Sequence, residues 1–297
     1  MSHISICVCT YRRQELLRRL LESLRELKTG GLFTYSIVVV DNDAAESARE
    51  VAAAFGQSSG VPVTYCVERR QSIALARNKA VENATGEYLV FIDDDEFPIH
   101  EWLYILYTVC NDRKVDGVLG PVLPHYDVEP PKWVRAGRFH DRETYPTGLV
   151  IDWRKGRTGN TFLRRRIFEG LEQPFDPVFR TGEDQEFFHR MICRGFMFIW
   201  CNEAVAYEVV PPIRWDRRFM IRRSLLRGAM EPSTPDFGAR EVFKSLVAIP
   251  LYSVALPFSA LAGQHKMMDL LVRLSFHVGK LLAFAGLNPV REAYVTE

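Results

Sequence analysis

The sequence predicts an α/β protein in which helices cover both faces of a largely parallel β-sheet. Over the first 125 residues, apolar runs with strand character alternate with segments of helical spacing, and the connections are short. Strands that alternate with helices are joined by right-handed crossovers, which make neighbouring strands parallel. The composition supports a folded core, since 47% of the residues are hydrophobic and 25% are charged. We expect one large domain over 1–230 and a short C-terminal helical segment over 231–297.

Each expected element follows from its residue pattern. Apolar and β-branched runs predict strands at 4–9, 35–40, 61–67 and 88–92. Helical spacing of apolar residues predicts helices at 14–28, 44–55, 73–84, 183–194 and 216–230. The stretch 196–210 has strand character. Between these elements, 125–158 is rich in Pro, Trp, His and charged residues, and we expect a long loop region that shapes a pocket.

Three polar clusters directly follow predicted strands. They are Thr10-Tyr11-Arg12, Asp41-Asn42-Asp43 and Asp93-Asp94-Asp95. In open α/β sheets, ligands bind beyond the carboxyl ends of the strands. The sequence therefore predicts a binding site at this edge of the sheet.

The aspartate triplet at 93–95 indicates a cation site. Adjacent carboxylates repel one another unless a cation or a hydrogen-bond donor neutralises them. A hard divalent cation that also holds a diphosphate is one solution, because such cations prefer oxygen ligands. The alternative is that one aspartate caps a helix that begins near His100 while the others are solvated. The context favours the metal site.

A second acidic pair, Glu183-Asp184, lies at the start of a predicted helix. Carboxylates in a first helical turn often only stabilise the helix dipole. A carboxylate that faces a metal-bound diphosphate can instead remove a proton from an acceptor hydroxyl as a general base. The local sequence leaves both interpretations open.

Composition and missing motifs exclude several classes of function. The net charge of +1 provides no basic field, so nucleic acid is not an expected partner. Neither GxxxxGKS/T nor GxGxxG occurs, which disfavours P-loop and dinucleotide chemistry. The six cysteines form no CxxC pair or zinc-like cluster and lie mostly in apolar runs, which favours a reducing, cytosolic compartment. The N-terminus begins with a strand pattern instead of a signal peptide, so we do not expect secretion.

Six motifs occur in order along the chain. They are Val8-Cys-Thr-Tyr-Arg12, Val40-Asp-Asn-Asp43, Ile73-Ala-Leu-Ala-Arg-Asn78, Phe91-Ile-Asp-Asp-Asp95, Thr158-Gly-Asn-Thr-Phe162 and Gly182-Glu-Asp-Gln-Glu186. With them, residues 3–230 resemble family 2 glycosyltransferases, which have the GT-A fold, a Rossmann-like nucleotide-diphospho-sugar transferase fold. Residues 93–96, 119–126, 130–133 and 217–218 are similar to bacterial exopolysaccharide repeat-unit glucosyltransferases of the succinoglycan type.

The resemblance implies a role for each candidate residue. It implies nucleotide contacts for Thr10, Tyr11, Arg12, Asp41, Arg77, Asn78, Asp93 and Asp94. Asp95 would bind Mg²⁺ or Mn²⁺ on the diphosphate, Asp184 would be the catalytic base, and Glu183 would orient a sugar. Many relatives carry a metal-binding histidine where this chain has Tyr207, and Glu208 is the candidate substitute.

A single base suits a one-step, in-line displacement that inverts the anomeric carbon. The resemblance implies a nucleotide-sugar donor, with UDP-glucose as the first choice, and a saccharide acceptor. A sugar-phosphate nucleotidylyltransferase is one alternative, although its Gly-rich, Arg-containing loop is replaced here by Cys9-Thr-Tyr-Arg-Arg13. A non-catalytic nucleotide-sugar-binding subunit of a polysaccharide assembly is another, and the intact Asp95 and Asp184 argue against it.

The C-terminal segment has the character of a membrane-associating element. Residues 245–263 include no charged residue and approach the ~20 residues that span a bilayer, although Pro250 and Pro257 would kink such a helix. After them, a polar stripe recurs every three or four residues, as in an amphipathic helix at a membrane interface: Lys266, Asp269, Arg273, His277 and Lys280. The alternative is a hairpin packed on the domain or on another subunit, which leaves oligomerisation open. With the resemblance, we expect the cytoplasmic face of the inner membrane and a lipid-diphosphate-linked acceptor.

Two groups of arginines, at 164–166 and at 214–227, remain ambiguous. They suit a diphosphate or anionic lipid headgroups. Solvated helical faces explain such runs as well.

Overall fold

The computed structural model describes residues 1–179, 182–233 and 237–287. The chain divides into two compact units. We call residues 1–124 and 142–209 the α/β unit, and residues 125–141 and 210–297 the helical unit. The expected division into domains 1–230 and 231–297 stays a prediction, and its last ten residues, 288–297, lie outside the described part.

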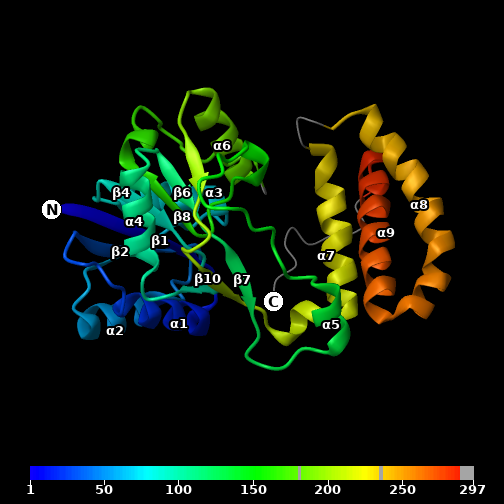
Figure 1. Cartoon of the computed structure of the whole chain (residues 1–297), viewed down its shortest axis with the longest axis horizontal. Coiled ribbons are helices and arrows are strands. Elements are labelled where there is room, and N and C mark those ends of the chain that lie inside the picture. Colours follow the sequence, from blue (N-terminus) through cyan, green and yellow to red (C-terminus); the bar gives the residue numbers. More distant parts are fainter. Residues whose placement is uncertain (180–181, 234–236, 288–297) are drawn as a thin grey trace. The chain divides into compact units, whose positions relative to one another are not determined.

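The α/β unit contains a seven-stranded sheet with the order β3-β2-β1-β4-β8-β6-β9 (Figure 1). Its strands are β1 Ser2–Thr10, β2 Phe33–Asp41, β3 Val63–Val67, β4 Tyr88–Phe91, β6 Gly117–Leu119, β8 Thr161–Arg164 and β9 Phe198–Trp200. Only β8 runs antiparallel to its neighbours β4 and β6. The predicted, largely parallel α/β sheet is confirmed.

The register brings the predicted polar clusters to one edge of the sheet. β1 and β2 pair in parallel over their whole length, which places Thr10 opposite Asp41. β1 pairs with β4 so that Cys7 lies opposite Phe91, two residues before Asp93. The carboxyl ends of three adjacent strands therefore meet, as expected of parallel strands joined by crossovers.

Helices cover both faces of this sheet. One core contains residues of α1 Gln14–Arg25, α2 Arg49–Ser59 and α4 Trp102–Asp112, and the other contains residues of α3 Ile73–Asn83 and α6 Glu183–Cys193. Side chains of β1 alternate between the two cores, since Ile6 and Val8 face the first and Cys7 faces the second. This alternation follows from the two-residue period of a strand.

A smaller, three-stranded sheet has the order β5-β10-β7. Its strands are β5 Glu96–Pro98, β10 Ala206–Val209 and β7 Val122–His125. β5 and β10 are antiparallel, with Glu96 directly opposite Glu208. This pairing places Glu208 beside the residue that directly follows the aspartate triplet.

Two predicted segments need correction. The second helix begins at Arg49 and not at residue 44, because the Asp41 carboxylate accepts hydrogen bonds from the backbone of Asp43 and Ala48 and holds the intervening residues in turns. The segment 125–158 is not one long loop. It contains the short helix α5 Lys132–Gly137 and a 3-10 turn at Trp153–Lys155.

The helical unit contains α7 Arg217–Met230, α8 Ala239–Ser259 and α9 Gln264–Phe284, and α9 lies between α7 and α8 (Figure 1). Small residues line the seam between α7 and α9. Ser224 donates a hydrogen bond to the Val272 carbonyl at 2.6 Å. A Cβ on Gly228 or Gly279 would lie 2.0 or 2.2 Å from a carbonyl oxygen of the facing helix, so the two backbones touch.

Candidate active site

The loop after β1 joins two acidic clusters at the edge of the sheet. The Thr10 hydroxyl donates a 2.7 Å hydrogen bond to Asp94. The guanidinium of Arg12 donates to Asp43, whose pKa this hydrogen bond holds below its ordinary value, and lies over the Tyr11 ring. Arg12 itself has a φ of 56°, in the left-handed region. Such strained backbone in a non-glycine residue is often found at functional sites.

Asp94 and Asp95 share an arginine that follows directly on this loop. One guanidinium nitrogen of Arg13 lies 3.1 Å from Asp94 and 3.3 Å from Asp95. Both carboxylates are buried, and burial raises the pKa of Asp94 to about 7 although Arg13 favours its ionised form. Neither aspartate caps α4, whose N-cap is Glu101. The capping alternative for the aspartate triplet is therefore wrong.

Arg77 links the aspartate triplet to the second acidic pair. It projects from α3, is 7% exposed, and forms ion pairs with Glu183 and, at 3.8 Å, with Asp93. Burial opposes its charge, but Glu183, Asp93 and Asp184 together keep the pKa of Arg77 above its ordinary value. Asp93 and Glu183, which are 90 positions apart in the chain, thus share one guanidinium, and this brings the aspartate triplet and the second acidic pair to the same place.

Glu183 and Asp184 form the first turn of α6, which begins after Gly182 in a left-handed conformation. Glu183 is 5% exposed, and burial raises its pKa. Its Oε2 atom is buried without a hydrogen-bond partner. A buried, unsatisfied carboxylate oxygen is costly in a folded protein and is found where a ligand or water completes the site.

Glu96 and Glu208 face each other across β5 and β10. Carboxylates directly opposite one another in a sheet repel. Arg142 offsets this repulsion, since its guanidinium lies 2.6 Å from Glu208 and 3.9 Å from Glu96. Burial and Asp93 raise the pKa of Glu96 well above its ordinary value, and its Oε1 atom accepts no hydrogen bond. Tyr207 packs on Phe97, with 5.4 Å between ring centroids.

Gly159 lets the backbone approach these carboxylates closely. A Cβ at this position would lie 2.9 Å from Glu96 and 3.1 Å from Asp93. The next residue, Asn160, is fully buried. Its side-chain oxygen accepts a hydrogen bond from Trp102, and its side-chain nitrogen donates to the carbonyls of Pro121 and Ala204. The Asn160 side chain therefore holds the loop in place.

Two predicted nucleotide-binding residues have their side chains engaged by the fold. The oxygens of Asp41 accept hydrogen bonds from Asp43, Ala48 and Tyr65. Asn78 exchanges two hydrogen bonds with the backbone of Phe175. These contacts position the loop after β2 and the segment before α6. The nucleotide contacts of both residues stay predictions.

Arg13, Glu96 and Arg142 are site residues that the sequence patterns did not predict. Arg13 and Glu96 directly follow predicted motifs, so adjacency was an available signal. Arg142 lies in an irregular segment with no such signal. Its role depends on the register of β5 and β10, which the local sequence does not specify.

The arginine triplet 164–166 lies outside this site. Arg165 donates to the carbonyls of Ala84 and Gly86, which precede β4, whereas the aspartates follow it. Arg166 pairs with Asp116 before β6. The suggestion that this triplet binds the diphosphate is therefore wrong, because it lies at the opposite end of the strands.

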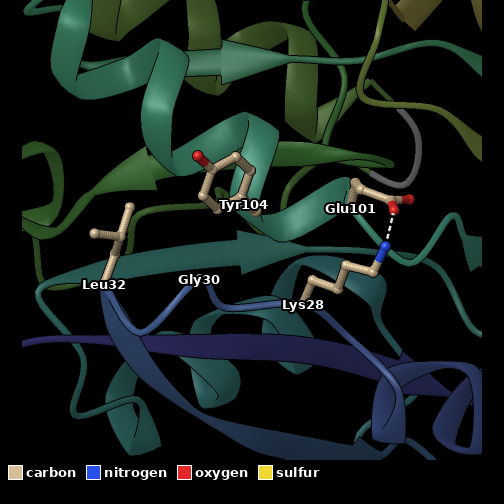
Figure 2. Close-up of a pocket in the computed structure, with 5 residues that line it drawn as sticks. All are labelled: Lys28, Gly30, Leu32, Glu101 and Tyr104. Carbon is tan, nitrogen blue, oxygen red and sulfur yellow. Dashed lines mark hydrogen bonds and ion pairs between the residues drawn. The ribbon is translucent and has the colours of Figure 1, made fainter.

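An open pocket of about 310 Å³ lies elsewhere in the α/β unit (Figure 2). It is lined by Lys28, Gly30, Leu32, Glu101 and Tyr104. Its two charged residues pair with each other, as the dashed line in Figure 2 shows. None of the lining residues belongs to the acidic clusters.

The donor atoms at the edge of the sheet suit a hard divalent cation. Asp93, Asp95 and Glu96 offer carboxylate oxygens, and Glu96 Oε1 has no hydrogen-bond donor. Over residues 1–179, 182–233 and 237–287, no three His, Cys, Asp or Glu side chains are close enough to hold a metal by themselves. Mg²⁺ is often held by one or two carboxylates and completed by substrate phosphates and water. The arrangement fits a cation that binds together with a diphosphate.

Comparison with known sequences identifies relatives of this chain. The family described as "Glycosyl transferase family 2" matches residues 5–182. The succinoglycan biosynthesis protein ExoM of Rhizobium meliloti is 35% identical over 228 residues, which cover 76% of this chain and 73% of ExoM. The glycosyltransferase AglE of Haloferax volcanii is 23% identical over 70% of this chain and 67% of its own length.

Solved structures share the fold. The mannosyltransferase PcManGT of Pyrobaculum calidifontis, in complex with GDP-Man and Mn²⁺, superposes with a TM-score of 0.61 at 18% identity, covering 94% of this chain and 86% of its own. TarS of S. aureus in complex with UDP has a TM-score of 0.56 at 14% identity, over 97% of this chain and 93% of its own. The predicted GT-A fold is confirmed.

Proposed function

Because the chain belongs to glycosyl transferase family 2, we propose that it transfers a sugar from a nucleotide diphosphate donor to a saccharide hydroxyl, with inversion and with a divalent cation. One observation carries this proposal. Arg77 joins Asp93, at the end of β4, to Glu183 beside Asp184, so the two acidic clusters border one site. A diphosphate-cation pair on one side and a base on the other is what a displacement at an anomeric carbon requires.

In the proposed reaction, Asp184 accepts the proton of the acceptor hydroxyl while that oxygen attacks the anomeric carbon. The bond from this carbon to the diphosphate oxygen breaks, and an α-linked donor gives a β-glycoside. Arg77 binds the Glu183 carboxylate and so orients Glu183, the neighbour of Asp184 in the first turn of α6. A cation bound at Asp95 would offset the charge on the leaving diphosphate. Glu208 is the candidate second ligand. To bind the cation, its carboxylate would have to release its ion pair with Arg142.

The finer identity of the substrates rests on the relatives. The similarity to a succinoglycan biosynthesis protein supports exopolysaccharide synthesis. We further propose a lipid-diphosphate-linked acceptor and the cytoplasmic face of the inner membrane as the place of action. UDP-glucose is the donor that we propose. The structural neighbours include complexes with UDP and with GDP-Man, so both nucleotides belong in the test.

A panel of nucleotide sugars tests the proposed activity. We expect Mn²⁺- or Mg²⁺-dependent release of free nucleoside diphosphate, fastest from UDP-glucose, and a β-linked product when acceptor is present. Release of pyrophosphate from a nucleoside triphosphate and a sugar phosphate would indicate a nucleotidylyltransferase instead. Donor binding without turnover under any of these conditions would indicate a non-catalytic subunit.

Asp184→Asn tests the base. We expect a loss of about 10²–10⁴-fold in transfer rate, because the acceptor hydroxyl keeps its proton, while donor binding survives. Glu186→Gln is the matched control, since Glu186 lies in the same helical turn but pairs with Arg190. Near wild-type transfer by Asp184→Asn would remove Asp184 from the mechanism.

A further inference from the structure

One side of α8 carries a continuous apolar stripe that the protein leaves exposed. Its members recur every three or four residues: Phe243, Leu246, Val247, Pro250, Leu251, Val254, Pro257, Phe258 and, just beyond the helix, Leu261. Each of the large apolar side chains among them is at least half exposed. The stretch Ala239–Ala262 contains an 18-residue window with a mean hydropathy of 1.7 and, by length and composition, is long and apolar enough to cross a membrane.

The opposite side of α8 is tied to α9 by polar contacts. The Ser245 hydroxyl forms a 2.9 Å hydrogen bond with Nδ1 of His277, and the Glu241 carboxylate forms an ion pair with Lys280 at 3.3 Å. Lys280 is 2% exposed and also pairs with Glu231, which follows α7, at 3.4 Å. If α8 left this layer to cross a bilayer, it would break the Ser245–His277 and Glu241–Lys280 contacts. If it took α9 with it, Lys280 would enter hydrocarbon, which is costly for a charged side chain.

The polar stripe predicted on α9 is therefore split. Arg273 is exposed and pairs with Asp269, whereas His277 and Lys280 face α8. Lys280 is buried and so is shielded from headgroups while α8 is packed in place. The apolar surface suited to lipid belongs to α8, whose other side packs on α9, and α9 in turn packs on α7.

Charge favours a lipid surface as the occupant of this stripe. The helical unit carries 15 Lys and Arg against 10 Asp and Glu, a formal charge of +5, while the α/β unit carries 23 against 27, or −4. Exposed cations flank the stripe, with Arg240 and Lys244 at one end of α8 and Lys266 beyond the other. Basic residues near an anionic bilayer are attracted by its negative surface potential.

We propose that α8 lies in the plane of an anionic bilayer, with its outer stripe in the headgroup–acyl boundary and its inner side still packed on α9. The protein is then held at one face of the membrane and does not span it through α8. This surface would bring the enzyme to a lipid-linked acceptor. Only the identity of that acceptor rests on the proposed function.

Vesicle flotation of the full chain tests the surface. Wild-type protein is expected to float with phosphatidylcholine vesicles that contain phosphatidylglycerol, and far less with pure phosphatidylcholine. Leu251→Glu with Val254→Glu should lower the partition coefficient about tenfold or more, because two stripe residues no longer enter the apolar layer. Leu32→Glu with Val150→Glu is the matched control, since it adds the same charge to exposed apolar positions of the α/β unit.

Labelling from outside the vesicles tests the orientation. Gly238→Cys and Gln264→Cys, each in a Cys193→Ser background, place a thiol at either end of α8. An impermeant maleimide should label both positions when α8 lies in the plane. Protection of one end until the vesicles are dissolved would mean that α8 spans the bilayer, and this result would overturn the proposal.

Two further readouts keep the outcomes separate. The first is the oligomeric state, measured by light scattering. If wild type is a dimer that does not bind vesicles and the stripe variant is a monomer, the stripe binds a second copy of the chain and the proposal is overturned. Donor hydrolysis in solution should be the same in wild type and in the stripe variant. If wild type floats but hydrolyses no nucleotide sugar, the proposed function fails while the membrane surface stands.

A second pair of substitutions, Phe243→Glu with Phe258→Glu, repeats the flotation test if the first variant does not fold.

Discussion

The α/β unit and the helical unit bury charge in opposite ways. In the α/β unit, carboxylates gather beyond the ends of β2 and β4, at the start of α6 and on β10, and Arg13, Arg77 and Arg142 only partly neutralise them. Glu96 and Glu183 each keep one buried oxygen without a hydrogen-bond partner. Among the described residues of α7, α8 and α9, no buried side-chain nitrogen or oxygen lacks a partner.

The difference shows what each unit is prepared to bind. Unsatisfied buried oxygens indicate a site that a polar ligand completes, here a diphosphate with its cation. Satisfied polar groups beneath an exposed apolar stripe indicate a surface completed by an apolar phase. The two units thus serve different parts of one proposed task, with the chemistry in the first and the attachment to lipid in the second.

The largest expected effect comes from Arg77→Met in the α/β unit. Removing the guanidinium leaves Glu183 buried without its partner, and such a loss costs about 3–5 kcal/mol in the free energy of unfolding. Urea titration followed by tryptophan fluorescence measures it. Arg69→Met, an exposed arginine paired with Glu46, should change this free energy by at most ~1 kcal/mol. Adding Glu183→Met to Arg77→Met should recover part of the loss, and no recovery would contradict the pairing.

A smaller effect is expected from Gly279→Ala in the helical unit. The added Cβ would meet the Leu225 carbonyl at 2.2 Å, so α7 and α9 must separate. Such overpacking costs about 1–3 kcal/mol, and thermal unfolding followed by circular dichroism at 222 nm should detect it. Gly238→Ala is the control, because nothing lies within 4 Å of its Cβ position. Equal stability of the two variants would mean that the seam is loose.

The smallest effect concerns pH. Burial, and then the nearby Lys280, lower the pKa of His277 below its ordinary value of 6.5. The unfolded chain therefore binds a proton first as the pH falls through 6.5, so this histidine contributes stability above that pH that is lost below it. Unfolding between pH 7.5 and 5 should show the decline, and His277→Asn should flatten it.

Much of the site was predictable because it depends on local patterns. Apolar runs that end in Thr10, Asp41 and Asp93 predict strand ends, and parallel strands share one edge. Six motifs in order then identify the family. The start of α2 was misplaced because Asp41 accepts backbone hydrogen bonds over the following turn, a contact that helical spacing does not reveal.

The sequence by itself determined the alternation of strands and helices, the edge where the acids gather and the apolar character of residues 245–263. These properties follow from periods of two and about 3.6 residues, which short segments carry by themselves. Only the tertiary structure decided that Arg77 reaches Glu183, that Glu96 faces Glu208 and that Lys280 points at α8. Each of these contacts joins residues that are distant in the chain, and strand register and helix packing set such contacts.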